Sequence, residues 1–269
     1  MKKGIFLVCL QLVACYCLAQ YDTAFLKAVK TFRGDYTDFT TDNLGNLYVL
    51  TRNNQLKKLS PNGDSISVYN DVRRYGKVYA IDATNPLKLL LYYKDFGTVV
   101  VLDRFLNVRT TLNLRQHNIF QVKAVSQSYD NNIWLYDEQE ARLQKLDEEG
   151  NLLLQFADFR QGIDAAPSPV RLIDYDRQLY LYDPGTGLFI FDYFGSLKSR
   201  LAFTGWRDFQ VVDNKIFGLK NNVLQQYQPG SLSLKEFPLG RAFLDSDKII
   251  LSTRLLYCLK NGVIQVYSF

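Results

Sequence analysis

The chain lacks most of the side chains that metal centres and nucleophilic active sites use. Its single histidine, His117, excludes multi-histidine metal centres and leaves few options for a general base. Three of the four cysteines lie within the first 17 residues, and Cys258 is the only one in the rest of the chain. A chain without residues 1–19 therefore has no intrachain disulfide, and its stability must come from a packed core.

Helical periodicity and the short motifs of common enzymes are also missing. No window of useful length has the i, i+3, i+4 spacing of an amphipathic helix. Phosphate loops, dinucleotide fingerprints, Gly-x-Ser-x-Gly elbows and zinc-ligand spacings do not occur. The 7 prolines are scattered, and no Ser/Gly-rich or charged linker marks a boundary. We expect one all-β domain over residues 20–269, with no cofactor and no metal.

The first residues predict export. Lys2-Lys3 and the apolar run Gly4 to Ala14 have the charged and hydrophobic regions of a secretory signal, and the run is too short to span a bilayer. We favour a signal peptide over residues 1–19, cleaved after Cys17-Leu18-Ala19. Leu12-Val13-Ala14-Cys15 also fits a lipobox, so a lipoprotein anchored at Cys15 is the alternative. The segment resembles export signals of the Bacteroidota, which implies a periplasmic or outer-membrane-associated protein.

Net charge gives little information about the partner. The formal charge of the whole chain is +5, from 32 basic and 27 acidic residues. Removal of Lys2 and Lys3 with the signal leaves 30 basic residues against 27 acidic ones, a net charge of +3. This is too small to predict a nucleic-acid partner.

Short apolar runs recur along the chain, with starts separated by 42, 44, 46, 37 and 33 residues. The six runs are Leu47–Leu50, Leu89–Tyr92, Ile133–Tyr136, Leu179–Tyr182, Ile216–Leu219 and Ile249–Ser252. A turn rich in Asn and Gly follows each run and a second strand, as at 61–63, 106–107, 148–150, 193–195, 229–230 and 261–262. The repeating unit is therefore four short antiparallel strands in about 40 residues, the size of one propeller blade.

Several of these strands are apolar on both faces, including Val99–Leu102 and Leu188–Phe191. A ring of blades buries both faces of each sheet against its neighbours, so we predict an all-β six-bladed β-propeller of four-stranded antiparallel blades. The stretch Phe25 to Phe32 alternates as well and could pair with the last blade, although that blade already has four strands in this interpretation.

The first and third repeats carry a family resemblance. Gly45–Leu50 followed by Gln55–Leu59, and Asn132–Asp137 followed by Leu143–Asp147, resemble NHL-type repeats. The similarity is moderate in repeats two and four and poor in five and six. It implies a six-bladed ring and no particular activity, because propellers host lyases, lactonases and pure scaffolds.

Individual polar residues favour structural roles. His117 lies in a polar connection between the second and third blades, and Cys258 lies within a predicted strand, which favours a solvated histidine and a buried thiol. Asp174/Asp176, Asp245/Asp247 and Asp147-Glu148-Glu149 lack the spacing of a calcium loop. Asp137 and Asp183 recur after Leu-Tyr, where a turn-forming role suffices.

Basic residues gather before the apolar runs, near the connections between blades, while many acidic residues fall in the other turns. This distribution predicts a propeller with one basic rim and one acidic rim. The alternative is that both sets of charges are ordinary loop residues that face water. Lys123, Arg171, Arg207 and Arg241 precede their runs by eight to ten residues, and Lys77 precedes its run by twelve. Together with Tyr79 and Trp206, which are able to stack on a ligand, they form the predicted ligand-binding set at one end of the channel.

Two functions fit this sequence. The first is a non-catalytic binding or scaffold propeller of the cell envelope that engages a protein, an anionic glycan or a peptide through the basic rim. The alternative is a hydrolase or lyase acting on an envelope or extracellular polymer, which would gather carboxylates, the histidine or a metal in the channel. We expect no catalytic residue and no nucleic-acid partner, and contact with a membrane only if Cys15 is lipidated.

Overall fold

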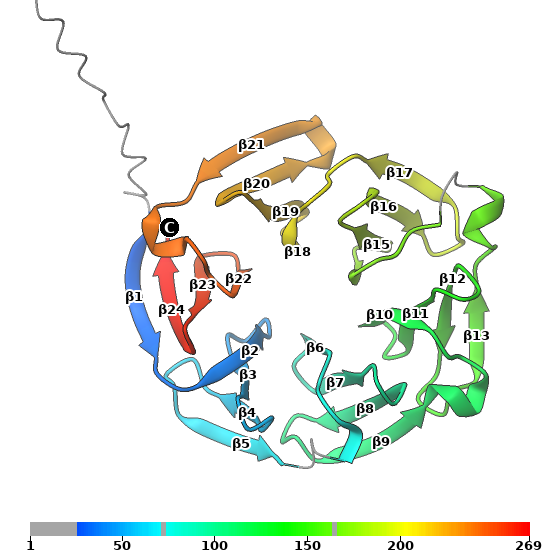
Figure 1. Cartoon of the computed structure of the whole chain (residues 1–269), viewed down its shortest axis with the longest axis horizontal. Coiled ribbons are helices and arrows are strands. Elements are labelled where there is room, and N and C mark those ends of the chain that lie inside the picture. The colour runs from blue at the N-terminus through cyan, green and yellow to red at the C-terminus, as the bar shows by residue number, and fades with distance from the viewer. Residues whose placement is uncertain (1–25, 71–73, 163–165) are drawn as a thin grey trace, which may run out of the picture.

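A computed structural model describes residues 26–70, 74–162 and 166–269, so the predicted signal peptide and Cys15 lie outside the described residues. Six four-stranded antiparallel sheets stand in a ring around a central axis (Figure 1). The predicted six-bladed β-propeller is confirmed. Helix among the described residues is limited to short 3-10 turns, which include η2 (Leu114–His117), η3 (Phe159–Gln161), η4 (Pro229–Ser231) and η5 (Arg241–Phe243). None of these could cross a membrane.

Each blade is numbered here from its inner to its outer strand. Blades 1 to 3 consist of β2 (Tyr36–Thr41), β3 (Leu47–Thr51), β4 (Leu56–Leu59) and β5 (Ser65–Tyr69); β6 (Ala80–Asn85), β7 (Lys88–Tyr93), β8 (Thr98–Asp103) and β9 (Val108–Asn113); and β10 (Val122–Gln127), β11 (Ile133–Asp137), β12 (Arg142–Leu146) and β13 (Leu152–Gln155). Blades 4 to 6 consist of β14 (Arg171–Tyr175), β15 (Gln178–Asp183), β16 (Gly187–Asp192) and β17 (Leu197–Leu201); β18 (Arg207–Val212), β19 (Lys215–Lys220), β20 (Val223–Gln228) and β21 (Ser233–Pro238); and β22 (Lys248–Leu251), β23 (Leu255–Lys260), β24 (Val263–Ser268) and β1 (Lys27–Phe32).

The core is divided into six clusters, and each cluster lies between two neighbouring blades. Between blades 3 and 4, for example, Trp134 and Tyr136 pack with Leu181 and Phe189, all of them at or near zero exposure. Burial of apolar side chains on both faces of each sheet is what stabilises the ring, because the described residues contain no disulfide and Cys258 is a buried free thiol.

Strand β1 closes the ring as the outer strand of blade 6, paired antiparallel with β24 (Figure 1). The interpretation that the last blade supplies four strands of its own was wrong. The sixth apolar run, Ile249–Ser252, belongs to the inner strand β22 and not to the second strand as in the other blades. The true counterpart of β19 is β23, and the turn at Asn261-Gly262 is the middle hairpin of the blade. The short interval of 33 residues reflected this misalignment.

Aspartates fix several hairpin turns in the way the sequence indicated. In the turn after β8, the Asp103 carboxylate accepts hydrogen bonds from the amides of Phe105 and Asn107, both at 2.8 Å. Asp42, Asp147 and Asp192 do the same in their own turns. Burial opposes ionisation of Asp103 and Asp147, but hydrogen bonds from the Asn107 and Asn151 side chains and from backbone amides hold their pKa values below the usual range. The Lys198 side chain, together with backbone amides, lowers the pKa of Asp192 in the same way.

Candidate functional site

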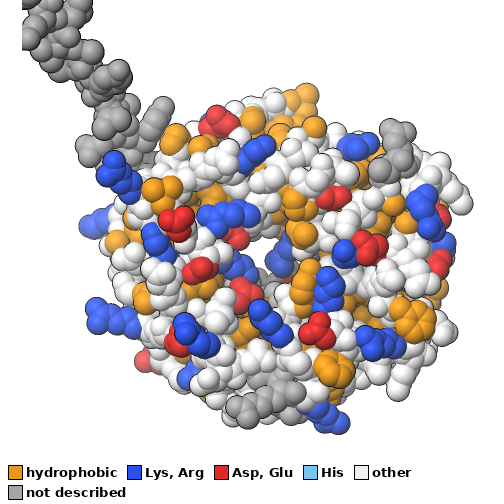
Figure 2. All heavy atoms as spheres, viewed as in Figure 1, with side chains coloured by type: hydrophobic (Ala, Val, Ile, Leu, Met, Phe, Trp, Pro, Cys, Tyr) orange, Lys and Arg blue, Asp and Glu red, His pale blue; other side chains and the backbone are white. Residues whose placement is uncertain are grey.

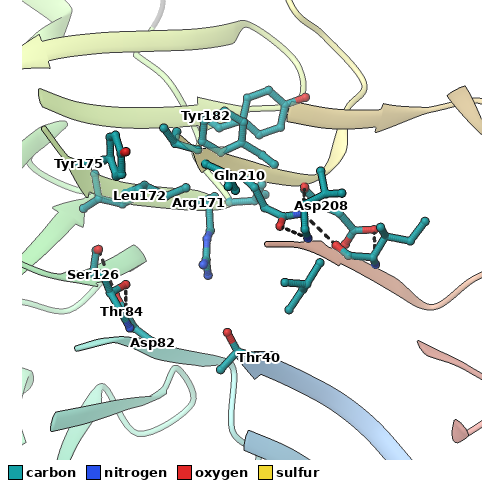
Figure 3. Close-up of a pocket in the computed structure, with 18 of the residues that line it drawn as sticks. Thr40, Asp82, Thr84, Ser126, Arg171, Leu172, Tyr175, Tyr182, Asp208 and Gln210 are labelled. Carbon is teal, nitrogen blue, oxygen red and sulfur yellow. Dashed lines mark hydrogen bonds between the residues drawn. The ribbon is translucent and has the colours of Figure 1, made fainter. Parts of the chain in front are cut away.

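The inner strands surround a channel along the axis of the ring. Figure 2 shows an open hole at the centre of the viewed face, with Lys and Arg side chains at its margin. A cavity of about 340 Å³ within the channel is lined by residues of all six blades, among them Thr40, Asp82, Ser126, Arg171, Asp208 and Lys248 (Figure 3). No single blade could form this cavity, so it depends on closure of the ring.

Register defines one equivalent position at the start of each inner strand, opposite the next-to-last residue of the second strand. The six residues at this position, in blade order, are Asp38, Ala80, Ala124, Arg171, Arg207 and Lys248. Blades 4 to 6 thus contribute three cations in succession, while blades 2 and 3 contribute two alanines that pack into the interblade core. We call Arg171, Arg207 and Lys248 the cationic mouth.

Arg171 has no protein partner in the part of the chain that the structure describes. Its side chain points away from Leu172 and Tyr182, into the space between the inner strands (Figure 3). No hydrogen bond or ion pair joins its guanidinium to another described residue. A guanidinium with five donors and no acceptor nearby is available to a carboxylate, sulfate or phosphate.

The other two cations are held by the protein. The Arg207 guanidinium donates to the backbone carbonyl and to the hydroxyl of Ser246, the latter at 2.9 Å. Lys248 Nζ lies 2.7 Å from Asp38 Oδ1, and both side chains are about one-third exposed. These contacts fix the two positive charges beside Arg171 without neutralising the guanidinium of Arg171 or of Arg207.

Asp208 is the second carboxylate at this end of the channel. It lies at a bulge in β18 with a φ of 53°, and its Oδ2 accepts the amide of Ile249 at 3.0 Å. Burial raises the pKa of Asp208 above its usual range, despite that hydrogen bond and the nearby charges of Lys248 and Arg207.

Two members of the predicted set occupy other positions. Arg241 lies in η5, seven residues before β22, because the sixth apolar run was aligned with the wrong strand. Lys248 holds the equivalent place, and the sequence analysis missed it. Lys123 is displaced by a bulge between Val122 and Ala124, and its Nζ lies 3.1 Å from Glu138 Oε1. A count of residues cannot detect a one-residue bulge.

The predicted aromatic residues differ in their access to a ligand. The Trp206 side chain is only 2 % exposed and stacks on Phe203 at 4.5 Å, so it belongs to the core between blades 4 and 5. Tyr79 is 42 % exposed and lines a separate hollow of about 300 Å³ with Lys77 and Asp38. Lys77 and Tyr79 therefore share a hollow with Asp38, which pairs with Lys248 of the cationic mouth. Trp206 is instead buried between blades 4 and 5.

The expected division into a basic and an acidic rim is incomplete. Asp245 and Asp247 lie in the connection between β21 and β22, on the same rim as Arg241. On that rim Arg52 pairs with Asp35, and Arg160 pairs with Asp158. Figure 2 likewise shows acidic and basic side chains interspersed over the viewed face. The cationic character is local to the channel and does not extend over the rim.

Among the described residues, neither the histidine nor the cysteine lies at the cationic mouth. His117 is exposed at the end of η2, in the connection between blades 2 and 3, and Cys258 is buried in β23, where burial raises its pKa to about 11. Asp137 and Asp183 accept turn amides, as expected. No cluster of three or more His, Cys, Asp or Glu side chains suited to a metal ion occurs in the described ranges.

Comparisons with known proteins give the fold and no family. No family model matches the chain, and no curated protein matches it. Solved structures with the same fold include virginiamycin B lyase of Staphylococcus aureus with quinupristin, at 9 % identity, a TM-score of 0.61 and coverage of 91 % of this chain and 98 % of that one. The Neurospora crassa Pan2 WD40 domain matches at 9 % identity, a TM-score of 0.66 and coverage of 90 % and 95 %.

BamB from Moraxella catarrhalis matches at 11 % identity and a TM-score of 0.55, with coverage of 91 % of this chain and all of that one. At such low identity these likenesses establish a propeller that resembles both an enzyme and a WD40 domain, and they leave the activity open. The NHL-type resemblance is not shown by any of them.

Proposed function

We propose that this protein is a non-catalytic binding propeller that receives an anionic group of a protein or glycan partner at the cationic mouth. The observation that carries the proposal is the Arg171 guanidinium, which points into a cavity of about 340 Å³ and has no partner among the described residues. Arg207, whose partners are the neutral carbonyl and hydroxyl of Ser246, adds positive charge beside it, while Lys248 is paired with Asp38. Low-dielectric channel walls strengthen the attraction for an anion beyond what the small net charge suggests.

We further propose that the protein works in the bacterial cell envelope. This part of the proposal rests on the signal-like residues 1–19, with cleavage before Gln20 favoured over lipidation of Cys15. Mass analysis of the mature N-terminus tests it. A chain that begins at Gln20 supports a periplasmic protein, and a diacylglyceryl group on Cys15 would instead place it on a membrane surface.

A hydrolase or lyase is the second candidate, and Asp208 is the observation that favours it. A carboxyl whose pKa is raised by burial beside a basic channel is a possible general acid. The virginiamycin B lyase structure with this fold is of a catalytically inactive variant, in which a histidine is replaced by alanine. Here the single histidine, His117, lies in an interblade connection and does not line the channel cavity, which favours binding over catalysis.

The test is binding of two carboxylate probes, hexaglutamate and tetragalacturonate, by isothermal titration calorimetry. We expect Arg171→Ala to weaken binding by about 10-fold or more, because one charge-assisted contact is lost. Wild-type affinity should fall between about 50 mM and 300 mM salt, since the Debye length shortens. Preference for hexaglutamate indicates a protein partner, and preference for tetragalacturonate indicates a glycan.

Arg254→Ala is the matched control. It removes the same charge from an exposed position in the hairpin between β22 and β23, at the opposite end of the channel. Equal binding by both variants, or no binding of either probe by the wild type, would refute the proposal. Loss of structure does not confuse the result, because the Arg171 side chain makes no hydrogen bond or ion pair within the part of the chain that the structure describes.

A further inference from the structure

The opposite end of the channel opens into a larger hollow of about 800 Å³, which the anion proposal does not use. Thr84, Asp174 and Tyr175 line both this hollow and the channel cavity, so the two spaces share a wall. Tyr129 and Tyr193 form another part of its lining. We call this hollow the tyrosine mouth. Its volume lies in the range of small-molecule sites.

An aromatic platform stands at the tyrosine mouth. The rings of Tyr129 and Tyr193 are parallel to within 6°, with centroids 5.1 Å apart. Tyr129 nevertheless remains 70 % exposed. Tyr193 stacks on the Tyr129 ring, and Lys145 Nζ lies 5.0 Å from the centroid of the same ring. The exposed remainder of the Tyr129 ring is a flat aromatic surface of the kind on which the C–H groups of a sugar ring stack.

One buried carboxylate fixes the platform. Asp174 is 9 % exposed; its Oδ1 accepts a hydrogen bond from the Tyr193 hydroxyl, and its Oδ2 accepts the Tyr129 amide at 3.2 Å. The same Oδ2 accepts Ser128 Oγ at 3.0 Å and Trp134 Nε1 at 3.1 Å. Both tyrosines are therefore positioned before any ligand arrives, which lowers the entropic cost of binding.

Polar groups without protein partners surround the platform. Asn43, Asp176 and Arg177 line the tyrosine mouth, are exposed, and make no side-chain hydrogen bond or ion pair with another described residue. Arg177 has a φ of 62°, in the turn position where blade 5 has Asn214. Arginine is unfavourable in this left-handed conformation, so its presence here is not explained by the turn.

The chemistry of these groups identifies the ligand class. Asp176 only accepts hydrogen bonds, Arg177 only donates them, and the Asn43 amide does both, which matches hydroxyl groups that donate and accept. Asp176 and Arg177 carry opposite charges, and the oxygens of Asp174 are already occupied by four donors. The groups left open therefore suit a ligand that both donates and accepts hydrogen bonds better than a simple ion. We infer that the tyrosine mouth is a binding subsite for a neutral saccharide, separate from the anion site at the cationic mouth.

Saturation-transfer NMR and calorimetry with cellobiose, maltose, chitobiose and mannobiose test this inference. We expect at least one of the four to bind with a Kd of about 1 mM or below. Tyr129→Ala should weaken that binding by about 10-fold, and Tyr129→Trp should retain it, because the stacking surface is removed in one variant and kept in the other. Both variants should melt at the wild-type temperature, since Tyr129 is largely exposed.

Two controls separate this site from other surfaces. Phe194→Ala removes an aromatic side chain that is 93 % exposed in the adjacent turn and does not line the hollow, so saccharide binding should not change. Arg171→Ala should also leave it unchanged, which distinguishes failure here from failure of the anion proposal. Absence of binding for all four disaccharides, or equal binding by the wild type and Tyr129→Ala, would overturn the inference.

Discussion

At the tyrosine mouth Asp174 accepts hydrogen bonds from four donors, whereas at the cationic mouth Arg171 has no partner among the described residues. Both charged groups belong to β14, at its two ends, and the strand is only five residues long. The hydrogen-bonding capacity of Asp174 is filled by contacts within the protein, while the donors of Arg171 are open to a ligand. Charge in the channel therefore cannot be interpreted from residue type alone, because its availability depends on the donors and acceptors around it.

The contrast between Asp174 and Arg171 predicts that loss of Asp174 has the largest effect on stability. Replacement by Ala leaves the Trp134 indole, the Ser128 hydroxyl and the Tyr193 hydroxyl without their acceptor in a buried place. We expect Asp174→Ala to lower the free energy of unfolding by about 3 kcal/mol in denaturant titrations. Asp176→Ala, two residues further along and exposed, should change it by less than about 0.5 kcal/mol. A similar loss in both variants would mean that the Asp174 network does not stabilise this mouth.

A smaller effect is expected where the cationic mouth does contact the protein. Lys248→Met removes the ion pair with Asp38, in which both side chains are about one-third exposed. We expect it to lower the free energy of unfolding by about 0.5 to 1 kcal/mol at low salt. The cost should shrink in about 1 M salt, because screening weakens the pair in the wild type. Arg171→Ala is the companion measurement and should cost nothing. A clear loss of stability in Arg171→Ala would show that this guanidinium is structural.

The smallest effect concerns pH and sharpens the role of Asp208. Because burial raises the pKa of this carboxyl in the folded chain, the native state binds more protons than the unfolded chain between the unfolded value, about 4, and the raised value. Its contribution to stability therefore falls as pH rises through that window. Asp208→Asn, which keeps an acceptor for the Ile249 amide, should become more stable relative to the wild type from about pH 4 towards pH 7. A difference that does not vary with pH would contradict the shift.

The sequence predicted the architecture well where local signals repeat. Apolar runs on both faces, Asn/Gly turns and turn-forming aspartates such as Asp137 and Asp183 are local features, and they correctly indicated six four-stranded blades. Blade 6 was the exception, since its outer strand β1 lies at the other end of the chain and its apolar inner strand β22 resembles a second strand. Local pattern could not decide between those two alignments.

The site was predicted less completely, for reasons of geometry. Arg171 and Arg207 line the channel cavity because no bulge precedes them in their strands, and their role in binding stays a prediction. A bulge displaces Lys123, and Arg241 was predicted from the wrong alignment of blade 6. Lys248 could have been found from the Lys-Ile-Ile-Leu pattern if that run had been taken as an inner strand. The Tyr129 and Tyr193 pair joins turns of two different blades, so no spacing in the sequence signals it.

The seam between β1 and β24 also determines how the ring would respond to a pulling force. Lys27, at the start of β1, is opposite Ser268, at the end of β24, so force applied to the two ends of the chain would load one end of the seam. Antiparallel strands loaded in this way separate one hydrogen-bonded pair at a time, as a zipper opens, and do not resist together in shear. A ring pulled at Lys27 and Ser268 would therefore yield first at its periphery, along the seam, while the inner strands that line the channel are still paired.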